Sequence, residues 1–158
     1  MVASNRARRR PAGARESEAS GDREPTEVVN YAALARFRYE LRKFQAFSKA
    51  AAKTAGLTPQ QHQALLVVRG FSDQGPVSVG DLAEFLLIRP HTAVELVDRM
   101  TRLELFARVI DGTDGRRVLI KLTKEGERRL QKLSQTNLRE LRAIGPTLTR
   151  MLETFRNS

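Results

Sequence analysis

The residues with the most distinctive chemistry lie between Val109 and Thr123, where two short apolar runs flank a polar tip. The glycines of that tip permit the positive φ angles that a tight hairpin turn requires. A turn does not require arginines, however, and a guanidinium on a hairpin tip suits the negative potential of a DNA minor groove or a phosphate. The tip comprises Asp111, Gly112, Thr113, Asp114, Gly115, Arg116 and Arg117.

Three charged side chains of this tip can act together. Arg116 can enter a minor groove, Arg117 can bind a phosphate, and Asp114 can hold the Arg116 guanidinium in one direction. As an anion, Asp114 gains nothing from direct contact with DNA, which favours this orienting role. The alternative is a solvated surface hairpin whose charges merely pair with one another.

The net charge of the chain favours a polyanionic partner. The 158 residues include 28 Lys and Arg against 18 Asp and Glu, which gives a formal charge of +10. Residues 1–25 contribute only +2, because six arginines there face four acids. The basic character therefore belongs to the remainder of the chain. Nucleic acid is the expected partner, with an anionic membrane surface as the second choice.

The residue types that are missing exclude several kinds of site. The chain has no cysteine, which removes disulfides, thiolate nucleophiles and cysteine redox sensing, and which fits a reducing cytoplasm. Only His62 and His91 supply imidazoles, and no Gly-rich phosphate loop is present, so we expect no metal, no cofactor and no enzyme. No apolar run approaches the ~18–20 residues that span a bilayer, and we expect no membrane partner.

Composition and periodicity divide the chain into four segments. The first is rich in Arg, Ala, Ser, Glu and Gly, which predicts a disordered basic tail. Thr58 and Gln61 are spaced as a capping box around Pro59 and mark the first helix of a lobe. In order, the segments are the tail 1–25, a helical segment 26–56, the lobe 57–123 and a second helical segment 124–158.

The first helix, expected over 27–54, is longer than a compact lobe needs. About 25 residues at 1.5 Å each extend nearly 40 Å, so part of this helix is expected to pack against a second chain. A last long helix is expected over 124–143, with a break at Gly145–Pro146 and a short helix over 147–155. The apolar stripe of the first helix comprises Leu34, Phe37, Leu41, Phe44 and Phe47.

The lobe between these helices has the pattern of a winged helix-turn-helix. Ser78 caps a short helix over 79–86, a tight connection follows, and a second helix is expected over 90–103. A two-stranded hairpin, 105–110 with 118–122, comes directly after it. The fold class is therefore mainly α with a small β-hairpin wing. The second helix has the length and the polar outer face to enter a major groove.

In this order and spacing, four stretches resemble the MarR family of bacterial winged helix-turn-helix transcriptional regulators. LTPQQHQALL (57–66) is similar to the family's entry into its second helix, and VSVGDLAEFL (77–86) to the first helix of its DNA-binding motif. LVDRM (96–100) is similar to the core of its recognition helix. DGTDGRRVLIKLTKEG (111–126) resembles its wing and the helix start that follows. The resemblance extends over residues 28–155.

The resemblance implies roles for particular residues. Asp114 and Arg116 match the family's Asp-x-Arg wing pair, which makes Arg116 the minor-groove arginine. Leu87 and Glu104 stand at turns where family members commonly have glycine, and a left-handed residue other than glycine costs on the order of 1 kcal/mol there. The positions where members touch the major groove are Arg89, His91, Thr92, Glu95 and Arg99.

The resemblance also implies an assembly and a mechanism. Family members are homodimers in which N- and C-terminal helices intertwine, here segments 26–56 and 124–158, around a DNA-binding lobe, here 57–123. Most are repressors that bind near-palindromic promoter DNA. Many release it when a small phenolic or other aromatic ligand binds between the dimer helices and the lobe. The implied protein is a cytoplasmic homodimer whose partners are double-stranded DNA, a second copy of itself and a small aromatic effector.

Three residues are candidates for contact with such an effector: Phe37, Phe44 and His62. The two phenylalanines belong to the apolar stripe of the first helix, so burial in a dimer core is the alternative for them. His62 shares the apolar side of its helix with Leu65 and Leu66. It is therefore a core histidine, a polar contact to a ligand or, least favoured, a metal ligand.

Several alternatives stay open at this level. His91 can contact DNA or remain solvated, and Glu95 can accept a hydrogen bond from cytosine N4 or remain solvated. Arg99 can bind a phosphate or pair with Asp98. The alternative function for the whole protein is a non-specific architectural DNA-binding protein, which uses charge without base readout. Equal binding of native and scrambled duplexes would identify that second class.

Overall fold

The computed structural model describes residues 29–110 and 118–156, so the predicted tail and the wing tip lie outside the described residues. The first helix begins at Tyr31 rather than at residue 27, because the Asn30 side chain caps it by accepting from the Ala33 N–H (3.0 Å). The elements are α1 (Tyr31–Thr54), α2 (Pro59–Phe71), the 3₁₀ helix η1 (Ser72–Gln74), β1 (Val77–Ser78), α3 (Val79–Phe85), α4 (Pro90–Arg102), β2 (Phe106–Ile110), β3 (Val118–Leu122) and α5 (Lys124–Arg156).

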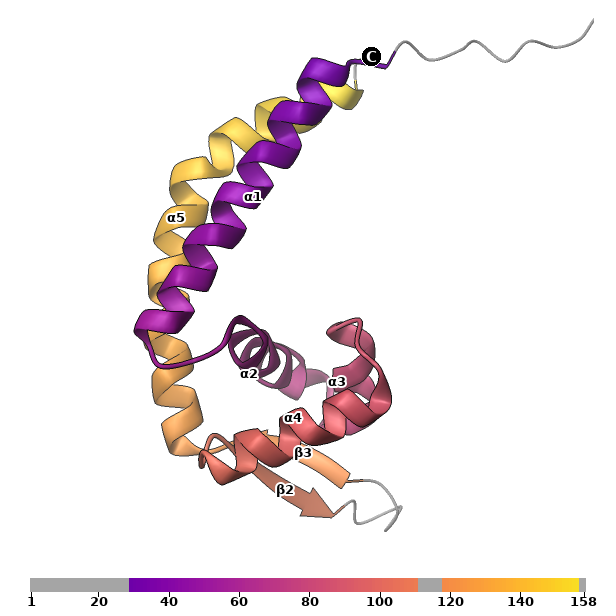
Figure 1. Cartoon of the computed structure of the whole chain (residues 1–158), viewed down its shortest axis with the longest axis vertical. Coiled ribbons are helices and arrows are strands. Elements are labelled where there is room, and N and C mark those ends of the chain that lie inside the picture. The colour runs from indigo at the N-terminus through magenta and orange to yellow at the C-terminus, as the bar shows by residue number, and fades with distance from the viewer. Residues whose placement is uncertain (1–28, 111–117, 157–158) are drawn as a thin grey trace, which may run out of the picture.

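Two long helices form an arm that extends away from a compact lobe (Figure 1). α1 and α5 run side by side along this arm, whereas α2, α3, α4 and the strands gather at one end of it. In the arm, the rings of Phe37 and Phe155 meet edge-on with centroids 5.8 Å apart. We call residues 31–50 with 138–156 the arm, and residues 57–123 the winged lobe.

The hydrophobic core lies in the winged lobe and at its junction with α5. Leu65, Leu82 and Phe106 are at most 2% exposed. In the arm, by contrast, no described residue is buried. Each helix of a two-helix pair can cover only one side of its neighbour, so the arm cannot complete a core by itself.

Two capping boxes begin helices at the positions that the sequence predicts. The Gln61 N–H donates to Thr58 Oγ1 (3.2 Å), and Gln61 Oε1 accepts from the Thr58 N–H (2.8 Å). At α3, the Asp81 N–H donates to Ser78 Oγ (3.2 Å), and Asp81 Oδ2 accepts from the Ser78 N–H (2.8 Å). Both pairs satisfy amide groups that a helix start would otherwise leave without partners.

The strands form an antiparallel sheet in the order β1-β3-β2. β2 and β3 are the predicted hairpin, and Ile110 lies opposite Val118 at its described end. β1 was not predicted, because two residues carry no detectable periodicity. It pairs Val77 with Ile120 and so joins the start of α3 to the wing.

α5 is one continuous helix, which corrects the predicted break at Gly145–Pro146 and the predicted separate helix after it. Pro146 lies inside Lys124–Arg156. A proline inside a helix removes one hydrogen bond and costs about 3 kcal/mol. Half-buried apolar side chains beyond it, among them Met151 and the Phe155 that contacts α1, offset this cost.

The two turns that flank α4 have left-handed residues, as the sequence predicts. Leu87 has φ 52° and Glu104 has φ 56°. The Leu87 side chain is 92% exposed, so no packing compensates for its backbone strain locally. The Ile88 N–H, just beyond that turn, donates to the carbonyl of Ala83 (3.0 Å) and closes the end of α3.

Candidate nucleic-acid interface

The position of α4 is set by its first residues and by its buried face. Arg89 has extended backbone (ψ 147°) immediately before Pro90, which occupies the first turn of the helix. A residue before proline favours this conformation. One stripe of α4 is fixed in the core, and the opposite stripe faces outward. The inner stripe comprises Ala93, Leu96, Val97 and Met100, each at most 1% exposed.

The outer face of α4 carries the residues that the sequence predicts as major-groove contacts. His91, Glu95 and Arg99 follow one another at intervals of four residues, and all three are exposed. Arg89 is exposed at the helix N-terminus, and Thr92 is half-buried next to it. The structure therefore places four of the five predicted residues on α4 and the fifth, Arg89, immediately before its first residue.

Several arginines around this face have no internal counter-ion. Among the described residues, Arg89, Arg99 and Arg102 form no ion pair. Asp98 pairs with Arg108 of β2 rather than with Arg99. This pair joins α4 to the wing, and nothing in the sequence pattern marks it. The three unpaired guanidiniums remain available to an external anion such as a phosphate.

The wing lies beside α4, as Figure 1 shows for β2 and β3. Its last described pair is Ile110 with Val118, and the Ile110 side chain is 76% exposed. Asp114, Arg116 and Arg117 belong to the tip at 111–117, outside the described residues. Their roles therefore stay predictions.

A hydrogen-bonded corner connects the end of α4 with the start of α5. The Thr123 N–H donates to the Leu105 carbonyl (3.1 Å), and Thr123 Oγ1 donates to the Glu104 carbonyl (2.5 Å). The Gly126 N–H in turn donates to Thr123 Oγ1 (3.0 Å). A Cβ atom at Gly126 would lie 2.3 Å from the Leu105 carbonyl oxygen, so only glycine fits this close approach.

A cavity of about 560 Å³ lies where the arm meets the winged lobe, between α1, α2 and α5. We call it the junction cavity. Two of the predicted effector residues, Phe44 and His62, line it. Phe37 is not among the described lining residues, and it packs against Phe155 in the arm instead. The volume is within the usual range for a small-molecule site.

Two buried polar side chains in the wall of the junction cavity each have one atom without a hydrogen-bond partner among the described residues. His62 is 2% and Asn137 is 7% exposed. Asn137 Nδ2 donates to the Leu133 carbonyl (3.0 Å), but Asn137 Oδ1 and His62 Nε2 have no partner among the described residues. Burial lowers the pKa of His62 and favours the uncharged imidazole. Nothing in the sequence marks Asn137, because a single Asn on an amphipathic helix gives no signal of its own.

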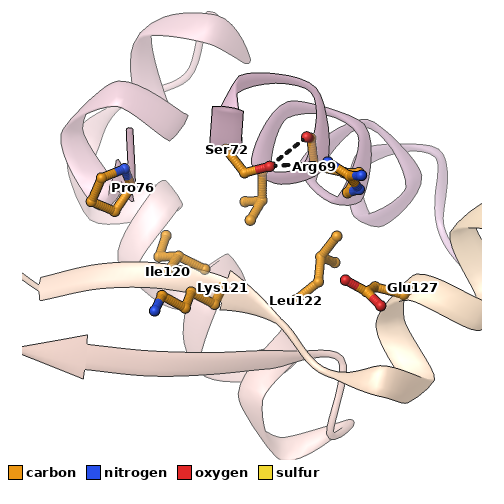
Figure 2. A pocket seen from close by; sticks show the side chains of 8 residues that line it. Arg69, Ser72, Pro76, Ile120, Lys121, Leu122 and Glu127 are labelled. Carbon is orange, nitrogen blue, oxygen red and sulfur yellow. Dashed lines mark hydrogen bonds between the residues drawn. The ribbon is translucent and has the colours of Figure 1, made fainter. Parts of the chain in front are cut away.

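A second cavity of about 430 Å³ lies between α2 and β3, and Figure 2 shows its lining. We call it the wing cavity. Its floor is apolar, with Ile120 and Leu122 from β3. Its lining also includes the charged side chains of Arg69, Lys121 and Glu127. The two cavities therefore differ in charge.

Residues 29–110 and 118–156 contain neither a metal-binding cluster nor a membrane-spanning helix. No three His, Asp or Glu side chains in these ranges gather where they could hold a metal ion. None of the helices in the same ranges is both long enough and apolar enough to cross a membrane.

The short α3, the outward-facing α4 and the adjoining hairpin define a winged helix-turn-helix protein. Residues 55–117 match a family model described as MarR family. YsmB of Bacillus subtilis (strain 168), named as an uncharacterized HTH-type transcriptional regulator, is 32% identical over 93 residues. The match covers 59% of this chain and 62% of YsmB, so the chain spans less than two thirds of that relative's length.

Solved structures share the fold of the described chain. MepR, a transcription regulator of the Staphylococcus aureus multidrug efflux pump MepA, has a TM-score of 0.65 and 20% identity, over 80% of this chain and 99% of MepR. A MepR–DNA complex has a TM-score of 0.56 and 22% identity, over 77% and 98% of the two chains. NadR in complex with 4-hydroxyphenylacetate has a TM-score of 0.62 and 21% identity, over 85% and 91%.

Residues 55–117 are thus similar to the MarR family, and the described chain shares its fold with solved structures such as MepR. YsmB and MepR are both named as transcriptional regulators rather than as enzymes.

Proposed function

We propose that this protein is a sequence-specific DNA-binding transcriptional regulator. The observation that carries the proposal is the outer face of α4, where exposed polar side chains and unpaired arginines lie beside a hairpin. A helix that is fixed on its inner side and cationic on its outer side suits a major groove. MepR, which has the same fold, has been solved as a DNA complex. A bacterial regulator of this kind acts in the cytoplasm.

The residues of α4 divide into two kinds of contact. Arg89 and Arg99, with charges that no described acid neutralises, bind phosphates and set the position of the helix. His91, Thr92 and Glu95 lie nearer its N-terminus and read base edges. A Glu95 carboxylate accepts from cytosine N4 and disfavours bases that present only acceptors.

The wing makes the contact in the neighbouring minor groove. Arg116 inserts there, where the negative potential is concentrated, and Asp114 orients its guanidinium. Arg117 binds an adjacent phosphate. The exposure of Ile110 at the described end of the hairpin supports a wing that projects from the lobe.

The functional unit is a homodimer. The arm buries none of its described residues, yet Leu34 on α1 and Leu152 on α5 are 41% and 54% exposed. A second copy that packs on the arm completes this core. Two winged lobes then meet half-sites about one helical turn apart on near-palindromic DNA. A dimer that covers a promoter in this way represses it by blocking polymerase.

A small aromatic ligand in the junction cavity releases the DNA. The cavity lies between the arm and the winged lobe, so its occupation changes how the two lobes of the dimer are spaced. NadR, which has the same fold, has been solved with 4-hydroxyphenylacetate. Phe44 and His62 are the proposed contacts. Phe37 packs against Phe155, and we assign it to the arm.

The test is fluorescence anisotropy on the DNA upstream of the protein's own gene, beside a scrambled duplex and across a salt series. A sequence-specific regulator binds the native duplex about 10³-fold more tightly, or better. Equal and steeply salt-dependent binding to both duplexes favours the architectural alternative. The same result would arise if the operator lay elsewhere in the genome, and selection from random DNA sequences separates these two explanations.

A further inference from the structure

We propose that the junction cavity takes an uncharged aromatic molecule that carries a hydroxyl or amide group, and that it discriminates against carboxylates. This inference rests on the proposed function, since it names the chemical class of the effector. The charge, the apolar wall and the unsatisfied polar atoms of the cavity support it.

The cavity offers no counter-ion to an anion. None of the eleven described residues that line it is Asp, Glu, Lys or Arg. The one ionisable side chain among them is His62, and burial lowers its pKa so that the imidazole is uncharged at neutral pH. A carboxylate that entered would give up its water without gaining an opposite charge.

The apolar wall of the cavity fits a ring. Phe44 of α1, Leu66 of α2 and two leucines of α5, Leu138 and Leu141, line it. Leu66, Leu138 and Leu141 are 37%, 46% and 41% exposed in the described chain. A ring placed among them removes apolar surface from water at no electrostatic cost.

The polar part of the wall selects a hydrogen-bond donor. One N–H of Asn137 Nδ2 donates to the Leu133 carbonyl, whereas Asn137 Oδ1 is a buried acceptor that has no partner among the described residues. His62 Nε2 in the same wall is also without a partner. A hydroxyl or amide can donate to Oδ1, whereas an ionised carboxylate is acceptor-only. The buried acceptor therefore favours the uncharged class.

The wing cavity provides the contrast. Arg69 and Lys121 line it, so an acidic molecule meets cationic groups there and not in the junction cavity. Arg69 Nη1 lies 3.7 Å from Asp73 Oδ1, and both side chains are largely exposed. A solvent-exposed ion pair of this kind is weak, so it does not prevent the Arg69 guanidinium from binding another anion. Arg69 is thus the matched control position for binding outside the junction cavity.

The experiment compares two probes that share a ring and a size but differ in charge: 4-hydroxyphenylacetamide and 4-hydroxyphenylacetate. Binding of each to the full-length protein is measured by ligand-observed NMR and calorimetry at pH 7. We expect the amide to bind at least ~10-fold more tightly than the acid. Equal or tighter binding of the acid overturns the proposal, and so does the absence of amide binding up to ~10 mM.

Two variants locate the binding. Asn137→Leu has a similar shape, and it removes both the hydrogen bond to the Leu133 carbonyl and a buried acceptor that has no partner among the described residues. These two effects oppose each other, so the variant is expected to fold with a thermal stability close to that of the wild type. It should weaken amide binding by ~10-fold or more, whereas Arg69→Leu should leave amide binding unchanged. Unchanged amide binding by Asn137→Leu overturns the proposal, as does loss of amide binding in Arg69→Leu.

Anisotropy on the same preparation separates this inference from the proposed function. A protein that binds no duplex specifically contradicts the regulator proposal, while the preference between amide and acid is still measured on the free protein. Specific DNA binding that the amide does not weaken, despite selective amide binding, contradicts the effector role alone.

Discussion

Burial decides what His62 can do, although the sequence leaves its role open. In the fold the ring is enclosed at the junction of the arm and the winged lobe, and its pKa is lowered as a result. A neutral ring in a cavity wall is a hydrogen-bonding group and not a cation. The same enclosure couples the stability of the protein to pH.

The pH dependence of stability follows from the sign of that shift. The unfolded chain, with an ordinary histidine pKa of about 6.5, binds the proton more readily than the folded chain. The contribution of His62 is therefore fully present above about pH 6.5 and is lost as the pH falls below it. We expect His62→Phe to show a shallower fall in melting temperature between about pH 7 and pH 5, measured by circular dichroism.

The exposed His91 supplies the control for this measurement. His91→Phe should keep the wild-type dependence on pH, because that side chain lies on the outer face of α4. Equal slopes for the wild type and His62→Phe would show that another group carries the pH dependence.

The proposed role of the wing can also be tested at a single residue, Arg116. Arg116→Ala should weaken binding to a specific operator by about 1–3 kcal/mol, because it removes the guanidinium proposed for the minor groove. Anisotropy measures the affinity, and light scattering confirms that the assembly is unchanged. Arg142→Ala removes the same charge from an exposed site on α5 and should have little effect. Wild-type affinity in Arg116→Ala would contradict the wing role.

At the scale of elements, the corner between α4, the wing and α5 is held by several hydrogen bonds and one close backbone approach. Glu104 turns in the left-handed region, and its carbonyl accepts from Thr123. Gly126 brings the first turn of α5 against the Leu105 carbonyl. α5 continues from there into the arm, so this corner links the orientation of α4 to that of the arm.

A Cβ atom at position 126 should lower the free energy of unfolding. Gly126→Ala places a methyl group against a backbone oxygen that cannot easily move, so we expect a loss of about 1–3 kcal/mol in the free energy of unfolding. Urea denaturation measures it. Gly145→Ala makes the same change in the same helix, where nothing lies within 4 Å of the new atom, and it should stabilise by up to about 1 kcal/mol. A neutral Gly126→Ala would show that the corner relaxes freely.

At the scale of the molecule, the arm is the part whose apolar surface is incompletely buried. Its helices leave large apolar side chains on the surface at positions where the winged lobe cannot reach them. The proposed association of two copies through this surface would account for helices longer than the lobe requires.

Charge on the arm should therefore break the dimer. The double variant Leu34→Glu with Leu152→Glu introduces carboxylates into the proposed interface, and we expect a monomer at micromolar concentration by sedimentation velocity. Operator affinity should fall with it, because two half-sites no longer act together. Leu87→Glu alters a leucine of the winged lobe that is 92% exposed and should leave the mass unchanged. A dimer in the double variant would place the interface elsewhere.

The sequence by itself determined the order and the type of nearly all elements. The caps at Thr58 and Ser78, the apolar stripe of α4 and the hairpin are local signals, because each depends on residues within about one turn or one strand pair. The left-handed residues Leu87 and Glu104 are expected from the resemblance to the MarR family, whose members commonly have glycine at these turns. The same signals placed the predicted DNA contacts of α4 on one helix.

Only the tertiary structure decided which distant groups meet. The Asp98–Arg108 pair, the two-residue strand β1 and the shared cavity of His62 and Asn137 each join segments that no local period relates. The continuity of α5 through Pro146 is of the same kind, because packing along the arm outweighs a local helix-breaking preference. Local chemistry sets what each segment prefers, and burial against the rest of the chain sets which preference prevails.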